Sequence, residues 1–188
     1  MKNDEQLSHA KEMLKDSNIK YTTDGKRHLG AVIGSVNFRR EYSNEKVMSW
    51  CLKIEKLAEI AILEPQAAYS AYIHGQQHKF NYFLQTIPGM ENYIDPLDIV
   101  INDRLLPAIL GRTISDLDRE IFKLPIRDGG LGIPILSNKA EVDFESSKRI
   151  TTPLSNVIIS QGKTLLPTEN VKEIRTERMK EIFVKHDE

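Results

Sequence analysis

Two pairs of carboxylates carry a spacing that metal-dependent chemistry uses. Asp95 with Asp98, and Asp116 with Asp118, are close enough in sequence to converge on metal ions. Two-metal phosphoryl transfer needs such carboxylates around ions held about 4 Å apart. Both pairs, however, stand where helices are expected to begin, and carboxylates there bond backbone N–H groups and oppose the helix dipole. We therefore predict that these carboxylates cap helices, and the sequence assigns no metal ligand.

The other reactive residue types are similarly sparse. His74 and His78 lie four apart on an expected helix, as in a zinc-binding His-Glu-x-x-His motif, but no glutamate separates them and no third His or Cys is nearby. Cys51 lies on the apolar stripe of its helix, which favours a small core residue over a nucleophile. The glycine loop at 128–133 lacks the Lys-Ser/Thr of a phosphate-binding loop, and a tight backbone turn is expected. The residues themselves predict no catalytic centre.

The composition of the chain excludes several broad classes of protein. The chain has 188 residues, with 40% hydrophobic and 28% charged, as in an ordinary folded domain. No apolar run approaches the roughly 20 residues of a membrane helix, and the polar start lacks a secretory signal. The single cysteine excludes an internal disulfide and fits a reducing compartment, so an intracellular location is expected, nuclear or cytoplasmic being open. A net charge of −1 excludes a globally basic nucleic-acid binder.

Hydrophobic periodicity predicts a mainly α fold, a helical bundle with one N-terminal β-hairpin. Two strands, at 19–23 and 26–33, are expected around a tight turn at Asp24-Gly25. Capping residues, prolines and apolar spacing predict helices at 7–14, from 45 to about 61, 65–87, 95–110 with a kink at Pro107, 115–123, 137–150, 152–162 and 168–186. We divide the chain into a first helix and hairpin (1–44), a helical domain (45–162) and a charged C-terminal helix (163–188).

Positive charge is concentrated near the hairpin. Between Lys20 and Lys46, six cations stand against three carboxylates, a local surplus of three on a chain that is nearly neutral. The cations are Lys20, Lys26, Arg27, Arg39, Arg40 and Lys46. Such a patch can track the phosphates of a nucleic acid, and it can equally be the solvated surface of a hairpin and a helix start.

A series of short segments occurs in a fixed order along the chain. They are 25–35, Lys46-Val47 with Trp50, 57–61, 64–69, 86–89, 95–98, 106–108 and Leu124-Pro125-x-Arg127-x-Gly129-Gly130-Leu131-Gly132-Ile133. In order and spacing these segments resemble the C-terminal part of retroelement reverse transcriptases of the non-LTR retrotransposon type. The resemblance covers roughly residues 7–161, most of the chain.

This resemblance implies a binding role. Residues 1–44 resemble the end of the palm with the primer grip, and the helices from Glu45 resemble the thumb, which packs along a template–primer duplex and reads its shape and phosphates. The implied partners are an RNA–DNA or DNA duplex and the upstream palm and fingers segments of the same polymerase. The resemblance implies that the hairpin residues Lys26, Arg27, His28 and Gly30 hold the primer terminus. With the neighbouring cations of the positive patch, the predicted nucleic-acid-binding residues are Lys26, Arg27, His28, Gly30, Arg39, Arg40 and Lys46.

One departure from the family limits the expected activity. Reverse transcriptases hold magnesium with aspartates that include a strand-turn-strand Asp-Asp element, and nothing in this sequence matches it. By resemblance the chain begins after that element. We expect no cofactor in this chain, magnesium in the full-length polymerase that it resembles, and no polymerase activity from the chain alone. The alternative is a helical protein–protein interaction module, or a decayed retroelement remnant without nucleic-acid binding, whose aromatic helix 69–83 packs on another protein.

Overall fold

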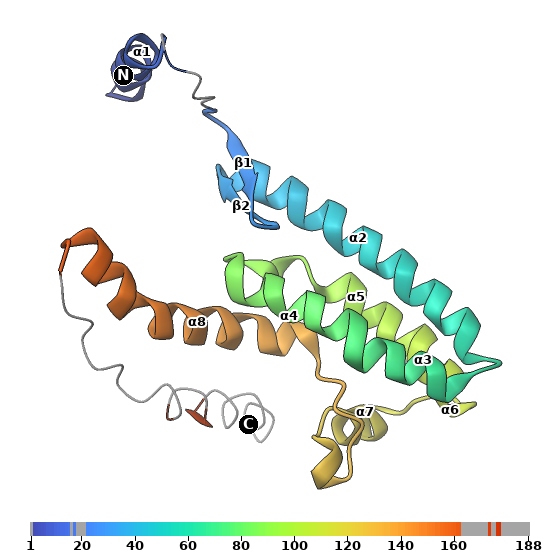
Figure 1. The fold of residues 1–188 in the computed structure, drawn as a ribbon. Helices are drawn as coiled ribbons and strands as arrows, with labels where there is room; N and C mark the ends of the chain where they lie inside the picture. The colour runs from blue at the N-terminus through green and yellow to red at the C-terminus, as the bar shows by residue number, and fades with distance from the viewer. Residues whose placement is uncertain (1, 16, 18–21, 163–172, 174–175, 178–188) are drawn as a thin grey trace.

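The fold is mainly helical with one two-stranded antiparallel hairpin, which confirms the predicted fold class (Figure 1). The computed structural model describes residues 2–15, 17, 22–162, 173 and 176–177. The elements are α1 (Lys2–Met13), β1 (Gly25–His28), β2 (Ala31–Gly34), α2 (Val36–Ala61), α3 (Pro65–Ala71), α4 (Gln77–Thr86), α5 (Asp95–Val100), α6 (Leu106–Leu110), α7 (Asp116–Phe122) and α8 (Leu136–Ile159). Within these ranges, no helix has both the length and the apolar character needed to cross a membrane. The predicted helix at 168–186 falls almost entirely outside them.

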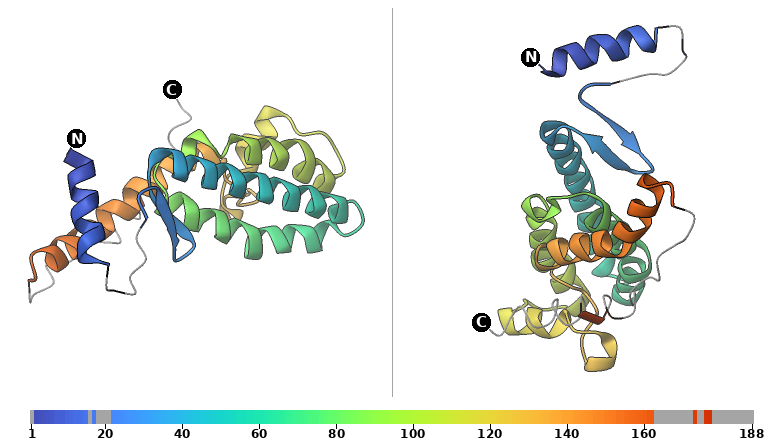
Figure 2. Two further views of the ribbon diagram at one scale, coloured as in Figure 1. Left: turned by 90° about the horizontal axis from the view of Figure 1, so that it is seen from above. Right: turned by 90° about the vertical axis from the view of Figure 1, so that its left-hand side faces the viewer.

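The core lies between long helical segments, each of which runs antiparallel to the one before it in the chain (Figure 1). α2, the α3–α4 segment and the α5–α6 segment lie side by side, and the N-terminal half of α8 packs across α4 and α5 (Figures 1 and 2). The predicted apolar stripe of α2 faces this core, with Val47, Trp50, Cys51, Ile54, Ala58 and Ala61 buried. The C-terminal half of α8 projects beyond the bundle, and α1 lies apart from it (Figure 1).

The hairpin exists, but its predicted turn was wrong. The chain reverses at Leu29-Gly30, and Asp24-Gly25 stands at the start of the first strand. Leu29 and Gly30 both have positive φ, 48° and 86°, as a two-residue turn matched to the strand twist requires. A Cβ built on Gly25 would lie 2.3 Å from the ring of Phe38. Gly25 therefore lets the strand approach α2 closely, a contact that local sequence does not reveal.

The helix predicted from Glu45 begins nine residues earlier, at Val36. Ser35 is its N-cap: the hydroxyl accepts from the backbone N–H of Phe38 at 3.1 Å and donates to Asp24 at 2.8 Å. The first turns carry few apolar residues, so periodicity alone missed them. α2 consequently runs through the predicted boundary between residues 44 and 45 and joins the hairpin to the helical bundle.

Both of the next two predicted helices are interrupted by a π-helical turn. In the aromatic helix the turn is Tyr72–Gln76, between α3 and α4, and in the next helix it is Ile101–Leu105, between α5 and α6. The second turn stands directly before α6, in which Pro107 lacks a backbone donor. The predicted kink near Pro107 is therefore a local π turn, and the helix ends at Gly111 as predicted.

The break predicted at Thr152-Pro153 was also wrong, because α8 continues through Pro153 to Ile159. The proline removes one backbone donor from this helix. In the same turn, the hydroxyls of Thr151 and Thr152 donate to the carbonyls of Ser147 and Lys148, at 3.0 and 2.6 Å. Side-chain hydrogen bonds thus support the helix where backbone hydrogen bonding is reduced.

Candidate nucleic-acid interface

The turn of the hairpin is tied to two helices by tyrosine hydroxyls. The Tyr42 hydroxyl on α2 donates to the carbonyl of Gly30 at 2.8 Å, and the Tyr82 hydroxyl on α4 donates to the carbonyl of Leu29. Both rings pack against Phe83, Tyr42 with ring centroids 6.2 Å apart and Tyr82 with centroids 5.7 Å apart. We call Tyr42 and Tyr82 the tyrosine clamp. The clamp was not predicted, because nothing in the local sequence distinguishes these tyrosines from core aromatics.

The predicted binding residues of the hairpin lie on both of its faces. Cross-strand partners point to the same side of a hairpin. Arg27 pairs with Val32, which is only 5% exposed and lies on the side that faces α2. Lys26 pairs with Ile33, which is 68% exposed, and so lies on the outer side. There Lys26, His28, Ile33 and residues just before and after the strands line a shallow depression of about 430 Å³.

The first half of α2 adds Arg39, Arg40 and Lys46 to this end of the molecule. The Lys46 ammonium lies 5.3 Å from the centre of the Tyr42 ring, a cation–π distance. Arg27 is also close enough to Tyr42 to act on it: burial raises the pKa of the Tyr42 hydroxyl, and the charge of Arg27 opposes that shift. The Lys46 ammonium thus lies at the Tyr42 ring, and the Tyr42 hydroxyl stays protonated as a donor.

These cations lack carboxylate partners. Within the described part of the chain, the salt bridges involve Arg112, Lys123, Arg127, Lys139, Lys148 and Arg149, and none includes Lys26, Arg27, Arg39, Arg40 or Lys46. The Nε atom of Arg39 is buried without a hydrogen-bond partner. Lys20, the sixth predicted cation, lies outside the described residues. We call Lys26, Arg27, His28, Gly30, Arg39, Arg40 and Lys46 the hairpin site.

The aromatic helix packs into the protein's own core. Tyr72 and Phe80 are fully buried, and Trp50 packs against Phe80 and Phe83 with ring centroids 5.0 and 4.7 Å apart. Tyr82 is the aromatic residue of this helix with substantial exposure, at 39%, and its hydroxyl is bonded to the hairpin. The aromatic face that the alternative function assigned to a protein partner is therefore occupied within this chain.

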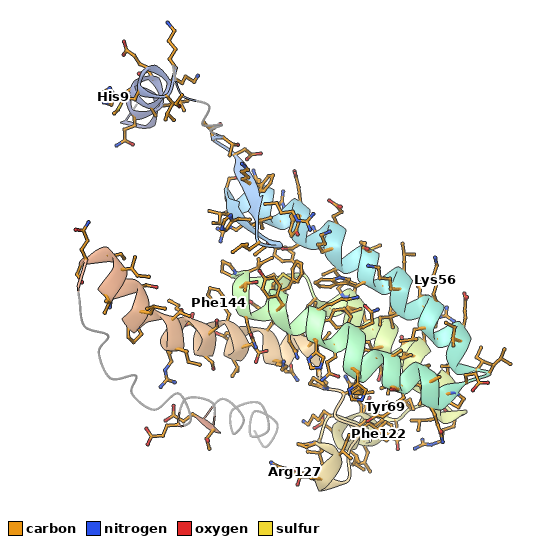
Figure 3. All side chains as sticks on the ribbon, viewed as in Figure 1. His9, Lys56, Tyr69, Phe122, Arg127 and Phe144 are labelled. Atoms are coloured by element: carbon orange, nitrogen blue, oxygen red, sulfur yellow. The ribbon has the colours of Figure 1, made fainter. Side chains whose placement is uncertain are left out.

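The glycine loop has a structural role in this fold. Tyr69 donates to the carbonyl of Leu131 at 2.7 Å, and Gln77 donates to the carbonyl of Gly132 at 3.1 Å. The buried Arg119 guanidinium donates to the carbonyls of Ile133 and Pro134, which follow Gly132 in the chain, at 2.7 and 3.0 Å. Figure 3 shows Tyr69 pointing toward this region, next to Phe122. The loop thus joins α7 to the helical bundle, with its carbonyls held by three side chains.

The carboxylate pairs do not form a magnesium site. Asp98 lies in the first turn of α5, near the positive end of the helix dipole, as predicted. Its two oxygens, however, accept from the backbone N–H groups of Leu136 and Ser137, each at 2.8 Å, so the helix that it caps is α8. Burial raises the pKa of Asp98, and these hydrogen bonds oppose the shift. Asp95, also expected to be an N-cap, is the exposed first residue of α5, and the N-cap position is Ile94.

The second pair behaves as the sequence predicts. Asp118 forms a capping box with Ser115 and a bidentate ion pair with Arg112, both contacts at 2.7 Å. The hydrogen bond from Arg112 holds the pKa of Asp118 well below its usual range. Because Asp98 and Asp118 are both engaged with protein donors, these residues do not fit a magnesium centre. The described residues contain no cluster of three or more His, Cys, Asp or Glu arranged for a metal.

His74, His78 and Cys51 show no arrangement for catalysis. Both histidines are exposed, and a π-helical turn lies between α3 and α4 at His74. Cys51 is 6% exposed, and burial raises the pKa of its thiol, which disfavours the reactive thiolate.

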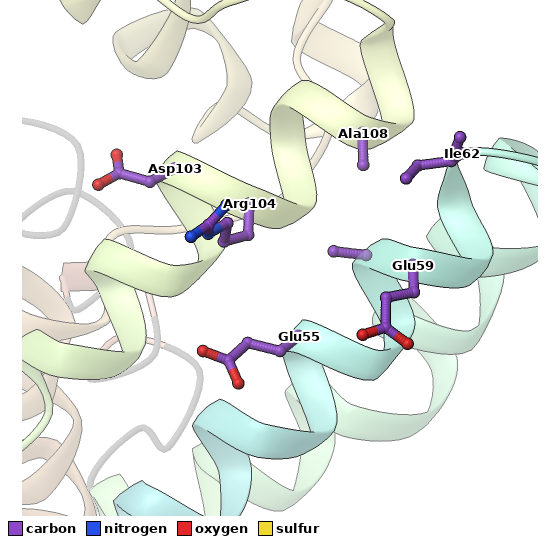
Figure 4. A pocket seen from close by; sticks show the side chains of 7 residues that line it. Glu55, Glu59, Ile62, Asp103, Arg104 and Ala108 are labelled. Atoms are coloured by element: carbon purple, nitrogen blue, oxygen red, sulfur yellow. The ribbon is translucent and has the colours of Figure 1, made fainter.

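A second depression, of about 390 Å³, lies between α2 and the α5–α6 segment, toward the end of α2 away from the hairpin (Figure 4). Its charged lining is mainly acidic, from Glu55, Glu59 and Asp103, with Arg104 as the cation. An acidic surface repels phosphates, so this depression is not a nucleic-acid site.

The chain was also compared with known proteins. No family model, curated protein or solved structure matches it. The resemblance to retroelement reverse transcriptases therefore stays a prediction, and the functional assignment depends on the hairpin site.

Proposed function

We propose that this chain binds a template–primer duplex, RNA–DNA or DNA, as a thumb-like part of a retroelement reverse transcriptase. The observation that carries the proposal is the hairpin site: cations from β1 and α2 gather at one end of the molecule, and none of them forms a salt bridge with a carboxylate of the described residues. Unpaired cations on a protein of net charge −1 make this end suited to a polyanion.

The chemistry of the hairpin site favours recognition of the nucleic-acid backbone over recognition of the bases. Lysine and arginine neutralise phosphates and release counterions, which supplies affinity without sequence information. A four-residue strand is too short to follow a groove over many base pairs, so the hairpin grips a local stretch of backbone. Binding is accordingly expected to depend strongly on salt and weakly on sequence.

Polymerisation would need residues outside this proposal. The carboxylates that resemble metal ligands in sequence are engaged in helix capping, and the palm and fingers segments of the polymerase would supply the magnesium site. We expect the purified 188-residue chain to show no magnesium-dependent primer extension. Primer extension by this chain alone would contradict that part of the proposal.

The test is fluorescence anisotropy of a labelled RNA–DNA hybrid titrated with the purified chain, from low to physiological salt. We expect the logarithm of the binding constant to fall linearly with the logarithm of the salt concentration, with a slope of about 0.7–0.9 for each phosphate contacted. Lys26→Ala/Arg27→Ala should weaken binding and reduce the slope. Lys53→Ala/Lys56→Ala, which removes two exposed cations of α2 outside the hairpin site, is the charge-matched control and should change both less.

Two results would overturn the proposal. The first is absence of binding even at low salt, which would favour the alternative of a protein-interaction module or a decayed remnant. The second is equal weakening by the hairpin and control variants, which would mean that the chain attracts nucleic acid only through its general surface charge.

A further inference from the structure

We infer that the tyrosine clamp, Tyr42 with Tyr82, positions the hairpin site for binding, so that removing two hydroxyl groups disengages the hairpin cations without removing any charge. This inference rests on the proposed function and assigns its positioning residues. It follows from the hydrogen bonds of both hydroxyls to the two central residues of the turn.

The hairpin needs such support because it is small and its turn is unfavourable. An isolated two-stranded hairpin is at best marginally stable in water. The turn places Leu29 at φ 48°, a backbone conformation that is unfavourable for residues other than Asn, Asp and Gly. The Leu29 side chain is 82% exposed. Packing of the Leu29 side chain therefore does not hold the turn, and the two hydroxyl bonds act at the place where the turn is weakest.

The clamp is built on rigid elements. Tyr42 and Tyr82 come from different helices, and both rings pack against Phe83, whose ring meets Trp50 edge-on at 4.7 Å between centroids. The aromatic core of the bundle thus fixes the position of the turn. Side chains held by packing in this way are the kind of support that a precise binding site requires.

The clamp also determines how strand and helix cations sit relative to each other. Tyr42 bonds the turn, lies beneath the Lys46 ammonium and interacts with Arg27, so one residue connects both groups of cations. If the turn were released, Lys26 and Arg27 would move relative to Arg39, Arg40 and Lys46. The duplex would then meet hairpin cations that are no longer fixed relative to the cations of α2.

The test uses Tyr42→Phe/Tyr82→Phe in the same anisotropy titration, with the full chain. The variant keeps both rings and every charge. We expect several-fold weaker binding at low salt and a salt slope smaller by about one to two units, as for the loss of up to two phosphate contacts. The same substitutions should have little further effect in the Lys26→Ala/Arg27→Ala background, because the hairpin cations are already absent there.

Tyr69→Phe is the matched control, since it removes a comparable hydroxyl-to-carbonyl bond of 2.7 Å at the glycine loop, away from the hairpin. It should leave affinity and salt slope unchanged. A rescue variant adds Leu29→Asn to Tyr42→Phe/Tyr82→Phe: asparagine before glycine favours this turn, so part of the lost slope should return. Far-ultraviolet circular dichroism and Trp50 fluorescence check that each variant is folded.

The outcomes separate the inference from the proposed function. If the unmodified chain binds and Tyr42→Phe/Tyr82→Phe binds with the same affinity and slope, the clamp is not a positioning device, and the proposed function stands. If Tyr69→Phe reduces the slope equally, the effect is general destabilisation, and the inference is again overturned. If the unmodified chain does not bind at low salt, the proposed function itself fails.

Discussion

Removal of the Asp98 carboxylate is expected to destabilise the protein more than loss of an ordinary helix cap, because this side chain caps a helix distant in sequence. Its two oxygens accept from the backbone N–H groups of Leu136 and Ser137 at the start of α8, each at 2.8 Å. The side chain of Ser115 caps α7 locally, whereas the start of α8 receives these bonds from a residue 38 positions earlier. Asp98→Ala would therefore uncouple α8 from the bundle at its first turn.

The expected change in the free energy of unfolding combines the hydrogen bonds that are lost with the desolvation of the carboxylate that is relieved. Two helix-start N–H groups lose their acceptor in a part-buried place, and each unsatisfied donor costs about 1–3 kcal/mol. Removal of a buried carboxylate also relieves desolvation, whose size is reflected in the raised pKa of Asp98. We therefore expect a loss of about 2–4 kcal/mol, somewhat above an ordinary N-cap loss of about 0.5–2 kcal/mol. Asp98→Asn keeps one acceptor oxygen and should lose about half as much.

The assay is urea unfolding followed by the fluorescence of Trp50, the single tryptophan, which is 4% exposed in the core. With a urea dependence of about 2 kcal/mol per molar, the midpoint should fall by about 1–2 M. Asp95→Ala is the control, because it removes an exposed carboxylate from the same helix and should lose only about 0.3–1 kcal/mol of dipole interaction. Equal midpoint shifts for Asp98→Ala and Asp95→Ala would refute this account of the α8 cap.

Three other predictions test the fold. A Cβ on Gly130 would lie 2.1 Å from a backbone carbonyl oxygen, whereas a Cβ on Gly129 would meet no atom within 4 Å. In thermal unfolding, Gly130→Ala should therefore destabilise the protein much more than Gly129→Ala, in which alanine only has to adopt a φ of 85°. Buried Cys51 should react slowly with a thiol reagent in buffer and rapidly in denaturing urea, and fast reaction in buffer would contradict its burial. Because the folded pKa of Asp118 is depressed, its pairing with Arg112 stabilises the protein above the unfolded pKa, near 4, and this contribution disappears as the pH falls toward the folded pKa. The melting-temperature difference between the unmodified chain and Asp118→Asn should accordingly be constant from pH 7 to pH 5 and shrink below about pH 4.

Local chemistry was enough to predict most helices and several of their ends. The apolar stripe of α2, the capping box at Ser115 and the glycine stop at Gly111 depend on residues within a few positions of one another. Such signals act inside a single helical turn, so they operate in much the same way whatever the rest of the chain does. The α2 start was missed because its first turns contact the hairpin, and that contact leaves little apolar periodicity.

The fold class, the helical stripes and the accumulation of cations between Lys20 and Lys46 follow from the amino-acid sequence alone. Tertiary structure alone decided where the hairpin turns, which helix Asp98 caps, and that two tyrosines hold the turn. The physical reason is separation along the chain: Tyr82 meets Leu29 across 53 positions, and Asp98 meets Leu136 across 38. A hydrogen bond between such distant groups forms only after the helices between them have packed, so no local pattern can record it.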